Sequence, residues 1–268
     1  MKKYWHVVNI GIQNNLAYRL NFLARTLFGL IPLTAMLMLW RTIYAGKGAD
    51  AQVGSYTLAE MLSYYLAVTV VAALTTVSED DWQIAADIRD GNINHFLAKP
   101  LDYLAYRLCL FFAGRAIYVA VAALPLGGFI FLLRDYLRWP ADPVTLGWFA
   151  VSVLLTALLQ FFISYALAML AFWVLEVSTF IFIVYAFEYI ASGHLFPLDI
   201  LPEGLQRLLA FTPFPYELYF AVGIFLGKVR GASLVQGLAT QLFWVLVAWA
   251  LARWAWRRGI RHYAAAGG

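Results

Sequence analysis

Long, nearly uninterrupted runs of apolar residues dominate this chain. Two of the longest cover residues 108–133 and 145–174. A run of about 20 apolar residues is long enough to cross the hydrocarbon core of a bilayer as a helix. Transmembrane β-strands would alternate apolar and polar residues, and these runs do not alternate. The pattern therefore predicts an all-α polytopic membrane protein.

Several such segments follow one another, separated by short polar or Pro-containing stretches. They predict six transmembrane helices, and an even number of crossings places both termini on the same side of the membrane. We therefore expect a single transmembrane domain over residues 1–268, with spans at 24–44, 58–77, 108–133, 145–174, 179–194 and 234–254.

The segment before the first predicted span is amphipathic. Apolar side chains recur there at helical spacing, at Trp5, Val8, Ile12 and Leu16. A helix with one apolar face lies in the membrane interface, with its aromatic side chains at headgroup level. We therefore predict an interface helix in residues 1–23. An ordinary amphipathic helix packed on protein is the alternative.

Composition narrows the chemistry of the chain. Hydrophobic residues make up 63 %, charged residues 13 %, and the formal net charge is +4. More basic residues lie on the side of the membrane that carries the predicted termini than on the other side. Basic residues are enriched in cytoplasmic loops. This predicts a multi-pass protein of the cytoplasmic (inner) membrane with both termini inside, and not a nucleic-acid-binding protein. Cys109 is the one cysteine, which excludes an internal disulfide framework.

Motifs that would supply energy or catalysis are absent from the sequence. Gly46-Lys47 and Gly227-Lys228 do not complete the Gly-x-x-x-x-Gly-Lys-Ser/Thr pattern of a phosphate-binding loop. The four histidines lack metal-ligand spacing, and no Gly-x-Ser-x-Gly elbow occurs. We expect no catalytic residue, metal or cofactor in this chain, and a partner or an ion gradient as its source of energy.

A few polar side chains fall inside the predicted spans. Ionisable groups in a membrane face a cavity or a neighbouring helix and often mark a transport path. Arg115 lies in the third span and Glu188 in the fifth, while Glu60 lies near a span end. Tyr165 and Tyr185 offer aromatic surface to an apolar substrate or a sugar. Arg115, Tyr165, Tyr185 and Glu188 are therefore candidate path residues, with a structural contact inside the bundle as the alternative for each.

The polar stretch 78–107 predicts two short helices between the second and third spans. Ser78 followed by three acidic residues is typical of a helix start, because a hydroxyl caps the first turn and acids favour the positive end of the helix dipole. Asp90-Gly91 ends this helix. A second helix over residues 92–98 stops before a Lys-Pro pair.

The second short helix would present Ile93, Phe96 and Leu97 as an apolar knob. A short helix with such a knob fits the groove of another protein. A solvated loop that merely covers the bundle is the alternative.

The stretch before the last span is punctuated by proline. Pro202 opens a short helix that runs to about residue 210, and Pro215 opens another that runs to about residue 227. Both are apolar yet too short to cross a bilayer. We therefore predict re-entrant helices in 196–231, which membranes tolerate only where the backbone packs on protein or lines a cavity. A surface loop with two helices is the alternative.

The chain resembles the permease subunit of ABC transporters of the ABC-2 type, in the short six-span branch without a large external domain. The likeness lies in the polar stretch 78–107 followed by the Pro-containing stretch 196–231. The resemblance covers nearly the whole chain. It rests on Arg89-Asp90-Gly91 and Lys99-Pro100 after the second span, and on Ser192-Gly193, Phe196-Pro197, Leu201-Pro202 and Pro213-Phe214 after the fifth.

The resemblance implies a role for each segment. Residues 89–98 would form a coupling helix on a cytoplasmic ATPase subunit, with the expected coupling residues Arg89, Asp90, Gly91, Asn92, His95, Phe96, Lys99 and Pro100. The Pro-rich stretch would form an external gate with Gly193, Phe196, Pro197, Pro202, Pro213, Phe214 and Pro215. Two permeases, identical or related, would form the path, and an ATPase dimer would bind ATP and Mg²⁺.

The sequence thus predicts a permease subunit of an ATP-driven ABC-2 type exporter that forms half of a translocation path. A self-contained ion-coupled secondary carrier is the alternative, and co-purification of an ATPase would discriminate between the two. A membrane enzyme acting on lipid is a third interpretation, and it lacks a clustered nucleophile, base or metal set.

Overall fold

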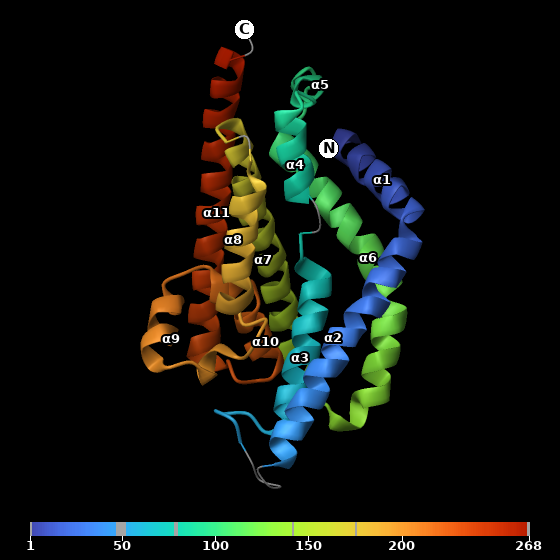
Figure 1. Ribbon diagram of the computed structural model, residues 1–268, viewed down its shortest axis with the longest axis vertical. Coiled ribbons are helices and arrows are strands. Elements are labelled where there is room, and N and C mark those ends of the chain that lie inside the picture. Colours follow the sequence, from blue (N-terminus) through green and yellow to red (C-terminus); the bar gives the residue numbers. More distant parts are fainter. Residues whose placement is uncertain (1, 47–51, 78–79, 141, 175, 267–268) are drawn as a thin grey trace.

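The computed structural model describes residues 2–46, 52–77, 80–140, 142–174 and 176–266 (Figure 1). The α-helices in these ranges are α1 Lys2–Ala17, α2 Arg19–Ala45, α3 Leu58–Thr75, α4 Asp80–Arg89, α5 Ile93–Leu97, α6 Tyr103–Leu133, α7 Pro143–Ala168, α8 Ser178–Ala191, α9 Glu203–Ala210, α10 Tyr219–Phe225 and α11 Gly231–Ala266. Short 3₁₀ turns are η1 Arg134–Tyr136, η2 Met169–Phe172, η3 Leu198–Ile200 and η4 Phe214–Glu217. The described ranges contain no β-strand, and the predicted all-α polytopic membrane fold is confirmed.

Five helices are long and apolar enough to cross a membrane: α2, α3, α6, α7 and α11. They contain most of the residues of the corresponding predicted spans. The fifth predicted span corresponds to α8, whose 14 residues rise only about 21 Å, less than the hydrocarbon core of about 30 Å. In Figure 1, α8 nevertheless runs from the end of the bundle that carries both termini towards the end that carries α9 and α10. We call these the termini end and the α9 end.

Three of the long helices, α3, α6 and α7, begin where the sequence supplies a capping side chain. Thr57 and Glu60 form a reciprocal capping box at the start of α3. Asp102 accepts a hydrogen bond from the backbone N–H of Ala105 at the start of α6. Asp142 accepts one from Thr145 at the start of α7. These caps satisfy backbone donors that the first helical turn leaves without intrahelical partners.

Two hydrophobic cores lie at opposite ends of the bundle. The core at the termini end joins residues of α4, α5, α6, α7 and α11. The core at the α9 end joins α2, α3 and α10 with part of α7. Large apolar side chains on the outer faces of α2, α6, α8 and α11 are exposed, including Phe28, Leu124, Phe182 and Trp254, as expected for surfaces that meet lipid or another subunit.

The N-terminal amphipathic region forms α1, and a break at Tyr18 separates it from α2. The predicted boundary at residue 23 was therefore too late. One face of α1 packs on α6: Val7 is buried, and a methyl group added to Gly11 would lie 2.9 Å from the Cβ atom of Ala113. Trp5 remains exposed on another face. The helix contacts protein along one side, and its position in the membrane interface stays a prediction.

Candidate functional site

The α4–α5 segment lies at the termini end of the bundle (Figure 1). Helix α4 ends at Arg89, and Gly91 just beyond it has a φ of +79°, the left-handed conformation that glycine adopts without strain. The five-residue helix α5 follows, close to the predicted range 92–98. The predicted cap Ser78 and the neighbouring Glu79 lie outside the described residues.

The expected apolar knob on α5 is wrong for two of its three residues. Ile93 and Phe96 face the bundle and are 1 % and 8 % exposed. The ring of Phe96 lies 4.7 Å from the rings of both Tyr103 and Tyr106 at the start of α6. The aromatic side chains at the start of α6 provide an apolar surface next to α5. Burial of Ile93 and Phe96 against the bundle is therefore more favourable than their exposure to water. Leu97 alone of the three is exposed.

The outward surface of the segment is otherwise polar. Arg89, Asp90, Asn92, Asn94, His95, Lys99 and Pro100 are exposed, and Gly91 is half-buried. The chain just after α5 is joined to other helices at its base. Lys3 on α1 donates to the carbonyl of Pro100 at 2.7 Å, and Asp102 forms an ion pair with Arg253 on α11. A force applied to α5 would therefore reach α1, α6 and α11 together.

At the α9 end, the turn after α8 is held by two tyrosines of α3. Tyr64 donates to the carbonyl of Gly193, and Tyr65 donates to that of Leu195 at 2.8 Å. Gly193 has φ of +90°, and a Cβ atom there would lie 2.7 Å from the Tyr64 hydroxyl oxygen. Only glycine fits this position without moving Tyr64.

The predicted helix at Pro202 is present as α9, whereas the one at Pro215 is divided into η4 and α10. Leu218, with φ of −154° and ψ of −60°, separates the two parts. Helix α9 lies outside the bundle with no buried residue, while α10 is buried against α3 and α7.

A buried polar network explains the break at Leu218. The carbonyl of Tyr216 accepts hydrogen bonds from Gln241 on α11 at 2.9 Å and from Thr156 on α7 at 3.3 Å. The carbonyl of Glu217 accepts one from Gln160 on α7 at 3.2 Å. Because side chains of the surrounding helices satisfy these carbonyls, η4 need not continue into α10 as one helix.

The carboxyl group of Glu217 is the most deeply buried acid in this region. The residue is 0 % exposed, and no N–H group of the described residues donates to either carboxyl oxygen. Glu188 on α8 faces it, and burial together with this second carboxyl raises the pKa of Glu217 well above its ordinary value of 4.5. Burial and the facing carboxyl therefore both disfavour ionisation of Glu217.

The remaining residues of the expected gate differ in burial. Pro197 is buried, and Phe196, Pro213 and Pro215 are half-buried. The ring of Phe214 lies 5.2 Å from that of Phe187 on α8. Pro202 is exposed before α9.

Three grooves share lining residues with one another. The first has a volume of about 1190 Å³ and lies between α1, α2, α4, α5 and α6. The second, of about 360 Å³, lies between α2, α3 and α6 and shares Arg25 and Arg115 with the first. The third, of about 190 Å³, lies between α3, α7 and α8 and shares Thr76, Tyr189 and His194 with the second.

The candidate path residues divide between these grooves and the core. Arg115 lines the first and second grooves, and Tyr185 and Glu188 line the third. Tyr165 lines none of them, because it is buried at 1 % exposure against Tyr103.

Sequence reasoning missed Arg25 and Glu217. Arg25 sits at the edge of the first predicted span, which made it look like an ordinary flanking charge. Glu217 is an acidic residue within an apolar, Pro-rich segment. An acid in such surroundings could have indicated a buried functional group from the sequence alone. Among the described residues, no group of three or more His, Cys, Asp or Glu side chains could hold a metal ion.

The long apolar helices define an all-α polytopic membrane protein. Residues 30–267 match the family model described as ABC-2 family transporter protein, so the chain belongs to that family, whose members are generally permeases of ABC exporters. No curated protein matches the chain, and no solved structure does.

Proposed function

We propose that this chain is a permease subunit of an ATP-driven ABC-2 type exporter in the cytoplasmic membrane. Both termini lie in the cytoplasm, and a separate ATPase dimer binds ATP and Mg²⁺ beneath α5. A second permease, of the same or a related sequence, completes the translocation path. Family membership supports this assignment.

The observation that carries the proposal is the α4–α5 segment. It stands at the termini end with a polar outer surface and the exposed Leu97, while Ile93 and Phe96 anchor it to α6. A short helix of this kind transmits motion only if it is tied rigidly to a bundle with two arrangements. The contacts to Pro100 and Asp102 supply such ties.

In this mechanism, closure of the ATPase dimer pushes on α5 and tilts α6 with it. Arg89, Asp90, His95 and Lys99 would form the polar rim of the contact around Leu97. At the α9 end, η4 and α10 would act as the external gate, because the carbonyls that fix them are held by α7 and α11.

One observation favours the rival function, an ion-coupled carrier. Glu217 and Glu188 form a buried pair of carboxyls in which the pKa of Glu217 is raised, and such a pair is the kind of group a proton-driven carrier uses. The two functions differ in their source of energy, so the experiment must change that source.

We would purify the tagged chain from its native membranes and measure subunit composition and ATP hydrolysis. An ABC ATPase should co-purify and hydrolyse Mg-ATP, and Leu97→Asp should lower the yield of the complex. Leu208→Asp, at an exposed position of α9, is the matched control and should not. Proteoliposomes of the chain alone that take up protons under an imposed gradient would instead establish the carrier.

A further inference from the structure

The first and second grooves differ in polarity, and they meet at two arginines. Among the described residues that line the first groove, Arg25, Lys99, Arg107 and Arg115 carry positive charge and Asp87 carries negative charge. Asparagine and glutamine side chains of α1 and α2 add further hydrogen-bonding groups to the same wall. The described lining therefore has an excess of positive charge and suits an anion.

The second groove is mainly apolar. Its lining includes Leu30, Leu33, Met36, Val68 and Leu126. Along α2 it extends from Arg25 to Met36, which is about 16 Å at the helical rise of 1.5 Å per residue. That length is about half of a hydrocarbon core of about 30 Å, or the depth of one leaflet. The groove therefore suits an extended hydrocarbon chain.

Arg115 is fixed at the junction of the two grooves. Its Nη1 atom lies 3.4 Å from the carbonyl oxygen of Ala73, in the last turn of α3, and its guanidinium lies 4.8 Å from the ring centre of Tyr118. Ala73 lies at the C-terminal end of α3, where the negative end of the helix dipole favours the positive charge of Arg115. Arg115 lies some 10 Å inside the predicted third span, where a charged group is stable only beside a cavity or a partner.

We propose that these two grooves bind one anionic amphiphile, with a phosphate-type headgroup at Arg25 and Arg115 and a hydrocarbon chain along α2 in the second groove. Guanidinium groups bind phosphate oxygens with paired, charge-assisted hydrogen bonds. The apolar groove begins at the same two residues, so a single ligand with one anionic end and one apolar end occupies both.

The role of this ligand rests on the proposed function. In an exporter whose termini lie in the cytoplasm, Arg25 lies at the level of the cytoplasmic leaflet, and the amphiphile would be the cargo taken from that leaflet. Binding itself needs only this chain, so the site can be tested without the ATPase.

The decisive experiment is native mass spectrometry of the purified full chain in detergent. Three probes are titrated: dioctanoyl phosphatidic acid, dioctanoylglycerol without the phosphate, and glycerol phosphate without the chains. We expect phosphatidic acid to bind at least tenfold more tightly than either other probe. Equal affinity for dioctanoylglycerol or for glycerol phosphate, or no binding of phosphatidic acid, would overturn the proposal.

Variants separate the two halves of the site. Arg25→Gln and Arg115→Gln should each weaken phosphatidic acid binding at least tenfold, with partial recovery in Arg25→Lys. Gly29→Leu should weaken it as well, because Gly29 lines the second groove and a Cβ atom there meets nothing within 4 Å, so the larger side chain fills the groove without disturbing the fold.

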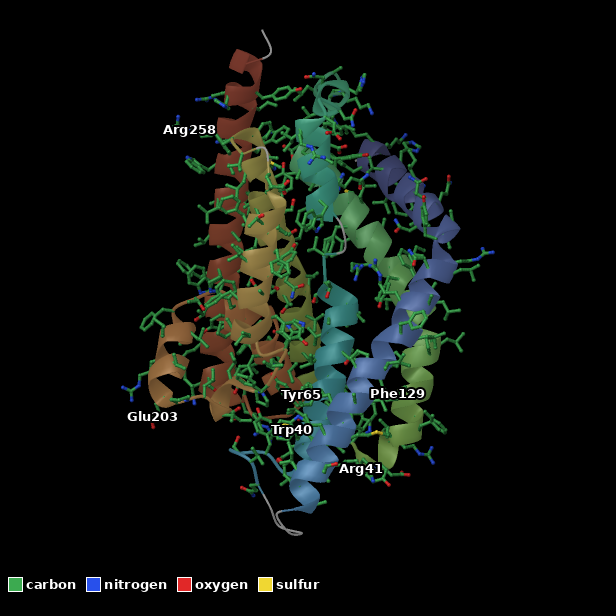
Figure 2. The ribbon with its side chains drawn as sticks, viewed as in Figure 1. Trp40, Arg41, Tyr65, Phe129, Glu203 and Arg258 are labelled. Atoms are coloured by element: carbon green, nitrogen blue, oxygen red, sulfur yellow. The ribbon has the colours of Figure 1, made fainter. Side chains whose placement is uncertain are left out.

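Arg41→Gln is the matched control, because Arg41 lies on the same helix near its other end (Figure 2), where its guanidinium lies 5.4 Å from the ring centre of Tyr136. Its affinity should equal that of the unmodified chain. Unchanged binding in both Arg25→Gln and Gly29→Leu would place the ligand elsewhere.

The cargo role has its own test in proteoliposomes of the permease–ATPase complex. A fluorescent phosphatidic acid should move between leaflets only with ATP, and a fluorescent phosphatidylcholine should move less. Binding without ATP-driven movement would overturn the cargo role, and failure to obtain an ATPase would count against the proposed function and leave the binding result intact.

Discussion

At the scale of single residues, the protonation of Glu217 decides how α8 is held against η4. An ionised carboxylate with no donor nearby and a second carboxyl beside it would be strongly destabilising in this position. Its raised pKa favours the protonated form of Glu217 beside Glu188. A neutral side chain of the same shape would make the same contact.

Glu217→Gln should therefore stabilise the protein at neutral and alkaline pH. Because the pKa of Glu217 is higher in the folded chain than its ordinary 4.5, folding takes up a proton between these two values, and stability falls as pH rises through the interval by about 1.4 kcal/mol per pH unit. Glutamine removes this loss. The melting temperature of the purified variant should exceed that of the unmodified chain at pH 8 and match it near pH 4.

The control is Glu203→Gln on α9, whose carboxylate is exposed and pairs with Arg207. It should leave the melting temperature nearly unchanged at both pH values. A Glu217→Gln variant that is less stable than the unmodified chain at pH 8 would mean that the acid is ionised in the fold.

At the scale of elements, the residues of α5 that anchor it to the bundle differ from those that face outward. Phe96 and Ile93 hold the helix to the bundle, and Leu97 with its polar neighbours faces outward. The apolar knob expected from the sequence treated all three as one surface. Helical spacing gave the positions, but which side of a five-residue helix is covered depends on Tyr103 and Tyr106, and the sequence alone does not say how their rings lie against α5.

Two substitutions should give opposite results on α5. Phe96→Ala removes a buried ring and should lower the free energy of unfolding by about 3–5 kcal/mol. Leu97→Asp changes an exposed position and should alter stability by no more than about 0.5 kcal/mol while it weakens ATPase binding. Thermal unfolding of the chain and the ATPase yield of the complex measure the two effects. Similar stability loss in both variants would contradict this division of roles.

The η4–α10 break should depend on Gln241. Its amide donates to the carbonyls of Ser152 and Tyr216 and to the Thr156 hydroxyl. Gln241→Leu leaves these buried acceptors without their amide donor, and each group that stays unsatisfied costs about 1–3 kcal/mol. Hydrogen exchange in residues 214–225 should rise in this variant and stay unchanged in Gln236→Leu, an exposed position on the same helix. Equal exchange in the two variants would show that other contacts hold η4.

At the scale of the whole molecule, the sequence predicted the class of fold because that depends on hydropathy and length, which are local. Proline and capping signals also placed α5 and α9 to within a residue or two. The grooves depend on residues far apart in the sequence: Arg25 of α2 and Arg115 of α6 line the same two grooves, and Glu188 of α8 faces Glu217 of η4. No pattern along the chain shows which of these residues lie together. The sequence could therefore name single candidate residues of the path, but not their arrangement.

The short helix α8 leaves one question of topology that a labelling experiment can answer. Three helices, α6, α7 and α8, lie between α5 and α9 in the chain, so these two segments lie on opposite sides of the membrane only if α8 crosses it. In a Cys109→Ser background, Asn94→Cys on α5 and Gly204→Cys on α9 would each be treated with a membrane-impermeant maleimide; both positions are exposed.

We expect Gly204→Cys to react in intact spheroplasts and Asn94→Cys only after the membrane is permeabilised. The Cys109→Ser chain without a new cysteine should not react in either case. Labelling of both positions in intact spheroplasts, or of neither, would place α5 and α9 on one side, and α8 would then be re-entrant. The reverse pattern would keep α8 as a crossing but turn α5 outward, where no cytoplasmic ATPase could reach it.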